Sequence, residues 1–177
     1  MLEILIIIFA VALDQIVKLA IVGTMSLGET IPVWQDVFHI TYVQNDGAAF
    51  SMMAGNMTLF YIITPIALVG FTWYMYKIRK EKVDGKNSII QIFEIVTIAM
   101  ILGGTIGNFI DRVSHGYVID MFDFRLINFA IFNVADIFLT VGTFLLVGVL
   151  CCEIVQEFKA DKLKKEEAIN NINDIQK

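Results

Sequence analysis

Four long runs of apolar residues alternate with polar segments along the chain. The runs cover residues 4–22, 58–76, 89–109 and 133–154. Each is long enough to cross the ~30 Å hydrocarbon core of a bilayer as a helix. The first run does not read as a cleaved signal peptide, because no Lys or Arg precedes it and charged residues interrupt its second half. The pattern predicts an α-helical integral membrane protein with four transmembrane helices, forming one membrane domain over residues 1–177.

The segment between the first two runs is more polar and has a different periodicity. Residues 37–43, VFHITYV, alternate β-branched and aromatic side chains with others, which is typical of a short strand. Gly28, Pro32 and the NDG sequence at 45–47 indicate turns. We therefore predict a small β-rich cap over residues 24–57.

Hydropathy and charge indicate the class of protein and its orientation in the membrane. A mean hydropathy of +0.71 excludes an ordinary soluble domain, and a net charge of -5 leaves no broad basic surface, so no nucleic-acid partner is expected. Basic residues collect in residues 77–86 and in the tail at 158–177, whereas residues 24–57 contain none. By the positive-inside rule, both termini are cytoplasmic and the cap is extracytoplasmic. The tail is expected to be a solvated or frayed helix.

Aspartates concentrate around the third and fourth runs. Asp111, Asp120, Asp123 and Asp136 all lie within residues 103–136, and acids in such an apolar setting are costly unless they have a function. The topology brings the outer end of the third helix and the first turn of the fourth to the same side. Asp14, in the outward half of the first helix, can face the same cluster. We expect Asp123 to be solvated in a connecting loop.

Paired carboxylates suggest a particular chemistry. In a partly desolvated site both cannot ionise easily, so one keeps its proton and the other acts as a base. Such a pair can activate water for amide hydrolysis without a covalent intermediate, and we expect neither a metal nor a cofactor. Asn108 and Asn133 lie three residues before Asp111 and Asp136, so each amide is expected to orient the acid that follows it on the same helix face.

Five motifs in order resemble the lipoprotein signal peptidase (signal peptidase II) family: DQIVK from Asp14, NDGAAF from Asn45, GNFIDR from Gly107, VIDM from Val118 and FNVAD from Phe132. The resemblance extends to about Ile154. It implies an intramembrane aspartic endopeptidase of the bacterial cytoplasmic membrane, with its site at the extracytoplasmic face. Its substrates would be prolipoproteins, cut on the N-terminal side of a diacylglyceryl-modified cysteine. Cyclic peptide antibiotics such as globomycin would inhibit it.

The same resemblance implies roles for individual residues. Asp120 and Asp136 would form the catalytic dyad, with Asp111 as the second-ranked partner. The supporting or substrate-binding residues would be Asp14, Lys18, Asn45, Gly47, Asn108, Asp111, Arg112, Asn133 and Ala135. Met121, Ala130 and Ile137 depart from the family's usual residues, and these departures bear on the shape of the side pocket.

Several alternatives remain open from the residues alone. Asp111, Asp120 and Asp136 could instead bind a divalent cation in a membrane hydrolase, or the acids could relay protons in a carrier or belong to a membrane scaffold. Asp14 and Lys18 are four residues apart and could simply neutralise one another. Glu94 lies near the cytoplasmic end of its helix, where it is expected to reach water.

Overall fold

The computed structural model describes residues 1–47, 57–80 and 88–175. Residues 48–56, 81–87 and 176–177 lie outside the described part, and with them lie the end of the NDGAAF motif and most of the basic loop. The described elements, in chain order, are α1 (Leu2–Thr24), β1 (Thr30–Trp34), β2 (Phe38–Asn45), α2 (Met57–Lys80), α3 (Ser88–His115), β3 (Val118–Asp123), a 3-10 turn η2 (Arg125–Ile127) and α4 (Val134–Ile175).

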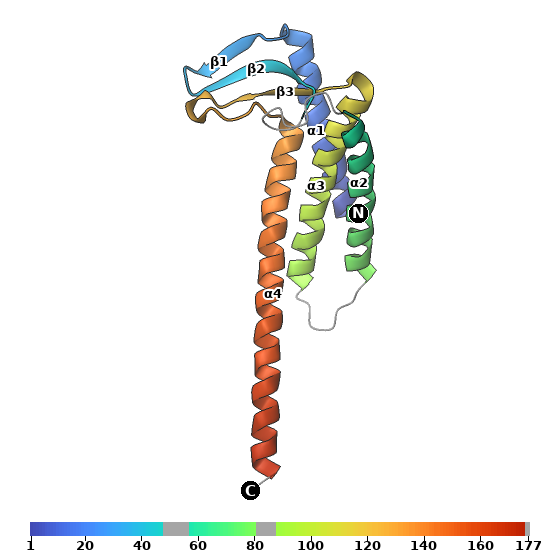
Figure 1. The fold of residues 1–177 in the computed structure, drawn as a ribbon, viewed down its shortest axis with the longest axis vertical. Coiled ribbons are helices and arrows are strands. Elements are labelled where there is room, and N and C mark those ends of the chain that lie inside the picture. The colour runs from blue at the N-terminus through green and yellow to red at the C-terminus, as the bar shows by residue number, and fades with distance from the viewer. Residues whose placement is uncertain (48–56, 81–87, 176–177) are drawn as a thin grey trace.

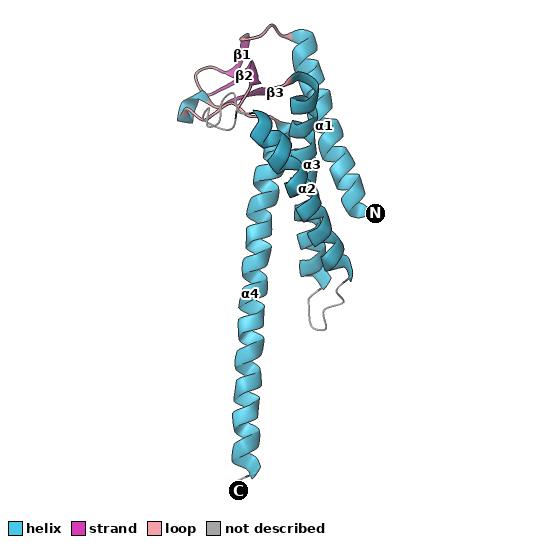
Figure 2. Cartoon of the chain, turned by 45° about the vertical axis from the view of Figure 1, so that its right-hand side comes forward, coloured by secondary structure: helices cyan, strands magenta, loops and turns pink. Residues whose placement is uncertain are grey.

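The helices run alongside one another, and the sheet lies across one end of the bundle (Figures 1 and 2). Within the described part of the chain, four helices are long and apolar enough to cross a membrane: Leu2–Thr24, Thr58–Lys80, Ile89–His115 and Val134–Glu166. Their outward faces carry exposed apolar side chains such as Leu19 and Phe144, as expected where lipid is the solvent. The predicted fold class, four membrane helices with a small β-rich cap, is confirmed.

Helix α3 forms the centre of the bundle. Ile98, Ile101 and Leu102 on α3 are buried and pack with Ile78 of α2 and Leu146 of α4. This core lies in the half of the bundle away from the sheet. The half nearer the sheet is more polar, and it contains the aspartates that were predicted to cluster there.

Glycines let α3 approach its neighbours closely, and the four-residue spacing of Gly103 and Gly107 in the sequence is typical of such packing positions. A Cβ at Gly103 would lie 2.7 Å from the Cβ of Ala10 in α1, and one at Gly107 would lie 2.6 Å from a carboxylate oxygen of Asp14. At Gly104 it would meet the backbone carbonyl of Ala135 in α4. Small residues at helix crossings are the usual device for such close packing within a membrane.

The cap is a three-stranded antiparallel sheet in the order β1-β2-β3. The predicted strand at 37–43 corresponds to β2, but the other two strands were not predicted. Pro32 was interpreted as a turn residue and instead lies in β1, where an edge strand tolerates its missing N–H. Residues Val118–Asp123 were placed in a connection, yet they pair with β2, with Val43 opposite Asp120.

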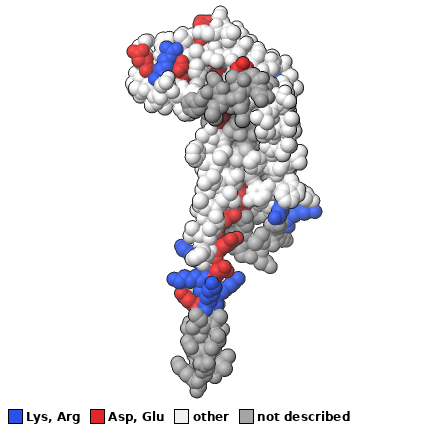
Figure 3. Space-filling view, viewed as in Figure 1, with Lys and Arg blue, Asp and Glu red and all other residues white. Residues whose placement is uncertain are grey.

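One further expectation differs from the structure. Glu94 does not reach water: it is fully buried, and its Oε1 accepts a hydrogen bond from the Tyr74 hydroxyl of α2 at 2.5 Å. The tail, expected to be a solvated or frayed helix, is the continuation of α4, which runs to Ile175 with residues 158–166 exposed. Figure 3 shows that Lys and Arg gather mainly toward the end of the helices opposite the sheet.

Replacing Gly104 with alanine is expected to destabilise the protein by about 1–3 kcal/mol. The added methyl group would meet the Ala135 carbonyl, which is backbone and cannot rotate away. Thermal unfolding in detergent measures the loss. Gly148→Ala in α4 is the matched control, since a Cβ there meets nothing within 4 Å. Equal melting temperatures for the two variants would contradict the close α3–α4 contact.

Candidate active site

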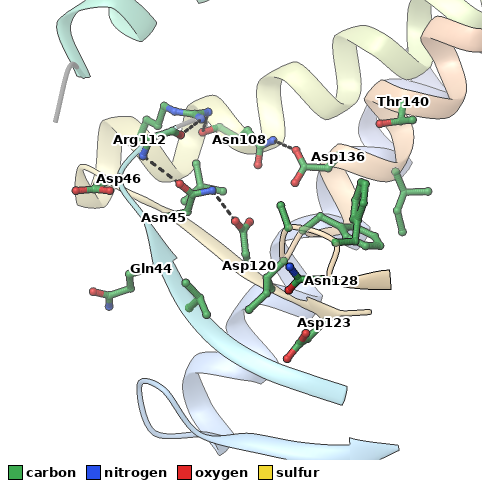
Figure 4. Close-up of a pocket in the computed structure, with 18 of the residues that line it drawn as sticks. Gln44, Asn45, Asp46, Asn108, Arg112, Asp120, Asp123, Asn128, Asp136 and Thr140 are labelled. Atoms are coloured by element: carbon green, nitrogen blue, oxygen red, sulfur yellow. Dashed lines mark hydrogen bonds between the residues drawn. The ribbon is translucent and has the colours of Figure 1, made fainter. Parts of the chain in front are cut away.

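A cavity of about 940 Å³ opens between the sheet and the first turns of α4. Residues from β2, β3, α3 and α4 line it, among them Asn45, Asn108, Arg112, Asp120, Asp136 and Thr140. Figure 4 shows the carboxyl groups of Asp120 and Asp136 directed into this cavity from different elements. Asp111 does not line it. The cavity therefore separates Asp120, Asp123 and Asp136, which line it, from Asp14 and Asp111, which lie behind it.

Strand β3 places Asp120 at the cavity because backbone hydrogen bonds hold the strand along both edges. One side pairs with β2, and on the other Phe122 exchanges backbone hydrogen bonds with Phe132, just before α4. Asp120 is 2% exposed. Its Oδ2 accepts from the Asn45 side-chain amide at 2.8 Å and its Oδ1 from the Asn133 side-chain amide at 2.6 Å. Both carboxyl oxygens thus have donors, as a buried polar group requires.

Asp136 belongs to the cap of helix α4. Asn133 precedes the helix, and its Oδ1 accepts the N–H of Asp136 at 3.0 Å, while Oδ2 of Asp136 accepts the N–H of Asn133 at 3.1 Å. This reciprocal pair has the geometry of a capping box. Asp14 adds a third bond, accepting the N–H of Ala135 at 2.9 Å. The start of α4 is therefore held by side chains of the site itself.

Behind the cavity, Lys18 joins the remaining acids. Its ammonium group lies 2.9 Å from Asp14, 2.9 Å from Asp111 and 3.1 Å from the side-chain oxygen of Asn108. Asp111 also accepts from Gln15 at 3.0 Å and from the backbone N–H of Ile119 at 3.0 Å. We call Asp14, Lys18, Asn108 and Asp111 the lysine cluster. Asp14 and Lys18 do form an ion pair, but Lys18 also pairs with Asp111 of α3. The two residues therefore do more than neutralise one another, because they link α1 to α3.

One expected amide contact is wrong and the other holds only in part. Asn133 bonds Asp136, three residues on, through its backbone N–H and its side-chain oxygen, whereas its side-chain nitrogen donates to Asp120 and Asn108. Asn108 does not bond Asp111; its side-chain nitrogen donates to Asp136 Oδ1 across the helix interface at 2.8 Å. The reason is that Lys18 occupies the oxygen of Asn108 and also supplies Asp111. Only the tertiary structure places that ammonium group between the two residues.

The remaining predicted residues lie at the rim of the cavity or beside it. The Asn45 side chain accepts the N–H of Gly47 at 3.0 Å, which forms a tight turn, and Arg112 donates to the Gly47 carbonyl at 3.5 Å. The Arg112 guanidinium lies over the ring of Phe60, 4.3 Å from its centroid. Ala135 is fully buried, where α4 meets Gly107 of α3.

Sequence reasoning missed or misjudged three residues. Asp123 was expected in a solvated loop, but it is 7% exposed, lines the cavity and accepts hydrogen bonds from Thr41 at 2.8 Å and Arg125 at 2.9 Å. Asn128 also lines the cavity and has a φ of 49°. The tolerance of asparagine for this conformation is the only feature of the sequence that could have pointed to a special position there. Gln15 had no signal beyond its place in the DQIVK motif, yet its side chain donates to Asp14 and Asp111.

The environment of Asp120 changes its acidity. Burial, together with a smaller effect of the neighbouring Asp136 carboxylate, raises the pKa of Asp120 to about 7. The amides of Asn45 and Asn133 and the charge of Lys18 act in the opposite direction, but burial outweighs them. Asp120 can therefore hold a proton near neutral pH in a site that also contains a second carboxyl group.

Comparisons with known proteins agree on one family. The sequence model of the signal peptidase (SPase) II family matches residues 6–152. The chain is 41% identical over 146 residues to the lipoprotein signal peptidase of Lactococcus lactis subsp. lactis, covering 82% of this chain and 91% of that protein. It is 43% identical over 154 residues to that of Clostridioides difficile, covering 86% and 97%.

A solved bacterial membrane enzyme, determined by the in meso method at 2.3 Å resolution, has a similar structure. It superposes with a TM-score of 0.74 at 36% identity, covering 86% of this chain and 88% of the other. A second such structure, at 1.9 Å, has a TM-score of 0.70 at 37% identity, covering 84% and 91%. The chain therefore belongs to the signal peptidase II family, as a multi-pass protease of a bacterial membrane that processes the signal peptides of lipoproteins.

Proposed function

We propose that the chain is an aspartic endopeptidase in which Asp120 and Asp136 activate the attacking water. Its substrate is a diacylglyceryl-modified prolipoprotein, cut on the N-terminal side of the lipidated cysteine. One observation carries the proposal: two carboxyl groups from separate elements enter the same cavity and share Asn133 as a hydrogen-bond donor. A peptide bond that entered this cavity would meet both.

The two carboxyl groups differ in a way that suits acid and base roles. Asp120, with its pKa raised to about 7 by burial, is the acid that donates to the scissile carbonyl oxygen. Asp136 is the base that takes a proton from water, and it stands in the first turn of α4, where a negative charge interacts favourably with the helix dipole. The water oxygen adds to the carbonyl carbon and gives a tetrahedral intermediate. As its C–N bond breaks, the proton held by Asp136 passes to the leaving amine, and one hydroxyl of the intermediate returns its proton to Asp120.

Asp111 fits neither the second-ranked catalytic role nor a metal site. Its oxygens accept from Lys18, Gln15 and the Ile119 N–H, and it lies outside the cavity lining. An ammonium group 2.9 Å away would also repel a divalent cation at that carboxylate. A hydrolase that needs Asp111, Asp120 and Asp136 as joint ligands is therefore disfavoured by the chemistry of the third acid.

Membrane orientation and inhibitor sensitivity belong to the same proposal. Lys77, Arg79 and Lys80 end α2 at the side opposite the cap, which favours cytoplasmic termini and an extracytoplasmic site. The substrate's lipid chains can then stay in the bilayer along the apolar face of α4 near Ile137 and Val141, both of which line the cavity. This lowers the entropic cost of bringing the peptide bond to the dyad. Globomycin-type cyclic peptides would occupy this cavity.

Asp120→Asn and Asp136→Asn are each expected to reduce cleavage at least about 10³-fold, since each removes one partner of a unit. A gel-shift assay in detergent with a diacylglyceryl-modified prolipoprotein measures this. Asp111→Asn is expected to keep measurable activity. Asp36→Asn is the matched control, because Asp36 is exposed and has a φ of 60°, which asparagine tolerates. Full activity in either dyad variant, with the fold intact, would refute the assignment.

The rate is expected to fall as pH rises through about 7, because Asp120 must be protonated and its pKa is about 7. A group with a raised pKa holds its proton below that value and loses it above. The acid form is thus available on the acidic side and lost on the alkaline side. Measuring kcat against pH in one detergent checks this. A rate that stayed constant up to pH 9 would contradict the assignment of Asp120 as the acid.

A metal chelator is expected to leave cleavage unchanged. The proposed mechanism moves protons between water and two carboxyl groups and needs no Lewis acid. The assay compares enzyme dialysed against EDTA with untreated enzyme. Loss of activity on dialysis, restored by a divalent cation, would favour the metal-dependent hydrolase instead.

A further inference from the structure

Lys18 is buried at 1% exposure and does not line the cavity, yet it contacts a residue that touches the dyad. An ammonium group has three N–H donors and no acceptor. All three find partners, in Asp14, Asp111 and the side-chain oxygen of Asn108. The atom of Asn108 that faces Lys18 must therefore be its oxygen.

This constraint decides what Asn108 offers to the dyad. With Oδ1 held toward Lys18, the amide nitrogen faces α4 and donates to Asp136 at 2.8 Å. If the amide were turned over, its NH₂ group would meet the ammonium, and its oxygen would meet the Asp136 carboxyl group. Both contacts would be repulsive in a buried site.

The orientation of the Asn108 amide also fixes that of a second amide, the side chain of Asn133. Oδ1 of Asn108 also accepts from the side-chain nitrogen of Asn133 at 3.0 Å, and that nitrogen's other hydrogen goes to Asp120 at 2.6 Å. The oxygen of Asn133 is thereby left for the N–H of Asp136. Lys18, Asn108 and Asn133 form a chain with one direction, which ends with an amide donor on each acid of the dyad.

We infer that Lys18 is a positioning residue for hydrolysis: its ammonium group orients the amides of Asn108 and Asn133 so that Asp136 and Asp120 each receive an N–H donor. The inference rests on the proposed dyad. It gives Lys18 a role beyond neutralising Asp14 and Asp111, and it explains why a lysine, rather than a neutral side chain, occupies the position. Without this charge the amide of Asn108 can turn over and withdraw its donor.

Lys18→Met is expected to lower kcat roughly 10- to 100-fold with KM nearly unchanged, because the reacting groups lose orientation while the cavity remains. The full chain is assayed in detergent with the diacylglyceryl-modified prolipoprotein, and kcat is normalised to folded protein. The matched control is Gln15→Met. Gln15 donates to the same two carboxylates, Asp14 and Asp111, but does not touch Asn108. A loss of kcat no greater than that of Gln15→Met would overturn the inference.

The alkaline limb of the rate profile gives an independent readout. The groups around Asp120 are Lys18 of α1, Arg112 of α3, Asn45 of β2, and Asn133 and Asp136 at α4. Because the charge of Lys18 lowers the pKa of Asp120, its removal raises that pKa. The midpoint of the alkaline fall is therefore expected to move to higher pH. Loss of the Asn133 donor to Asp120 moves the midpoint in the same direction, so an unchanged midpoint would overturn the inference.

Two further variants cover a failure of Lys18→Met to fold. The pair Lys18→Met with Asp111→Asn removes one charge of each sign, and its kcat is expected to fall below that of Asp111→Asn alone; equal values would overturn the inference. Asn108→Asp keeps an oxygen for Lys18 but replaces the donor toward Asp136 with a second carboxylate oxygen, the same unfavourable contact as a turned-over amide. It is expected to lose kcat as Lys18→Met does, and full activity would also overturn the inference.

These outcomes separate the two proposals. If folded Lys18→Met is as active as wild type while Asp136→Asn is inactive, the dyad stands and only the positioning role fails. If wild type does not cleave the substrate, or if Asp136→Asn does, the proposed function is refuted, and the positioning role that rests on it is refuted as well.

Discussion

The site depends on the ion pairs that Lys18 makes with Asp14 and Asp111 inside the helix bundle. A buried charge is costly unless it is paired and hydrogen-bonded, and removing one partner leaves the other exposed to that cost. Here one lysine from α1 satisfies an acid on its own helix and an acid on α3. The helices cannot separate without breaking these contacts. The position of the GNFIDR segment relative to α1 is thereby set by electrostatics as well as by packing.

The close approach of the backbones makes those ion pairs possible. Gly107 has no side chain, so the Asp14 carboxylate can lie against α3 and also reach the N–H of Ala135 in α4. One carboxylate thus bonds to α1 and α4 while it lies against α3. In a membrane there is no hydrophobic force between helices, and small residues with interhelical hydrogen bonds supply the cohesion. The same residues therefore serve both stability and the geometry of the site.

The start of α4 combines a structural role with the proposed catalytic one. Every helix begins with N–H groups that lack partners within the helix. In this protein the partners come from Asp14, Asn133 and Asp136. Asp136 consequently has little rotational freedom, and its position follows from where the helix begins. A dyad held by a helix cap on one side and a strand on the other needs no flexible loop to bring its members together.

The four spans and the β-rich cap followed from the sequence alone, and the resemblance of the motifs suggested Asp120 and Asp136 as the proposed dyad. The length of an apolar run is a local property, and it decides whether a helix can span a bilayer. The motifs are also local, so a match to a motif identifies the residues at each of its positions. The sequence also indicated Gly103 and Gly107 as packing positions, because their spacing puts them on one helix face.

Tertiary structure alone decided the pairing of residues far apart in the chain. Residues Val118–Asp123 became a strand because β2 and Phe132 lie on either side of them, which no local pattern indicates. Asp123 is buried for the same reason. Asn108 serves Asp136 rather than Asp111 because a lysine 90 residues earlier takes its oxygen. The orientation of an amide depends on its partners in space, and a sequence lists only its neighbours in the chain.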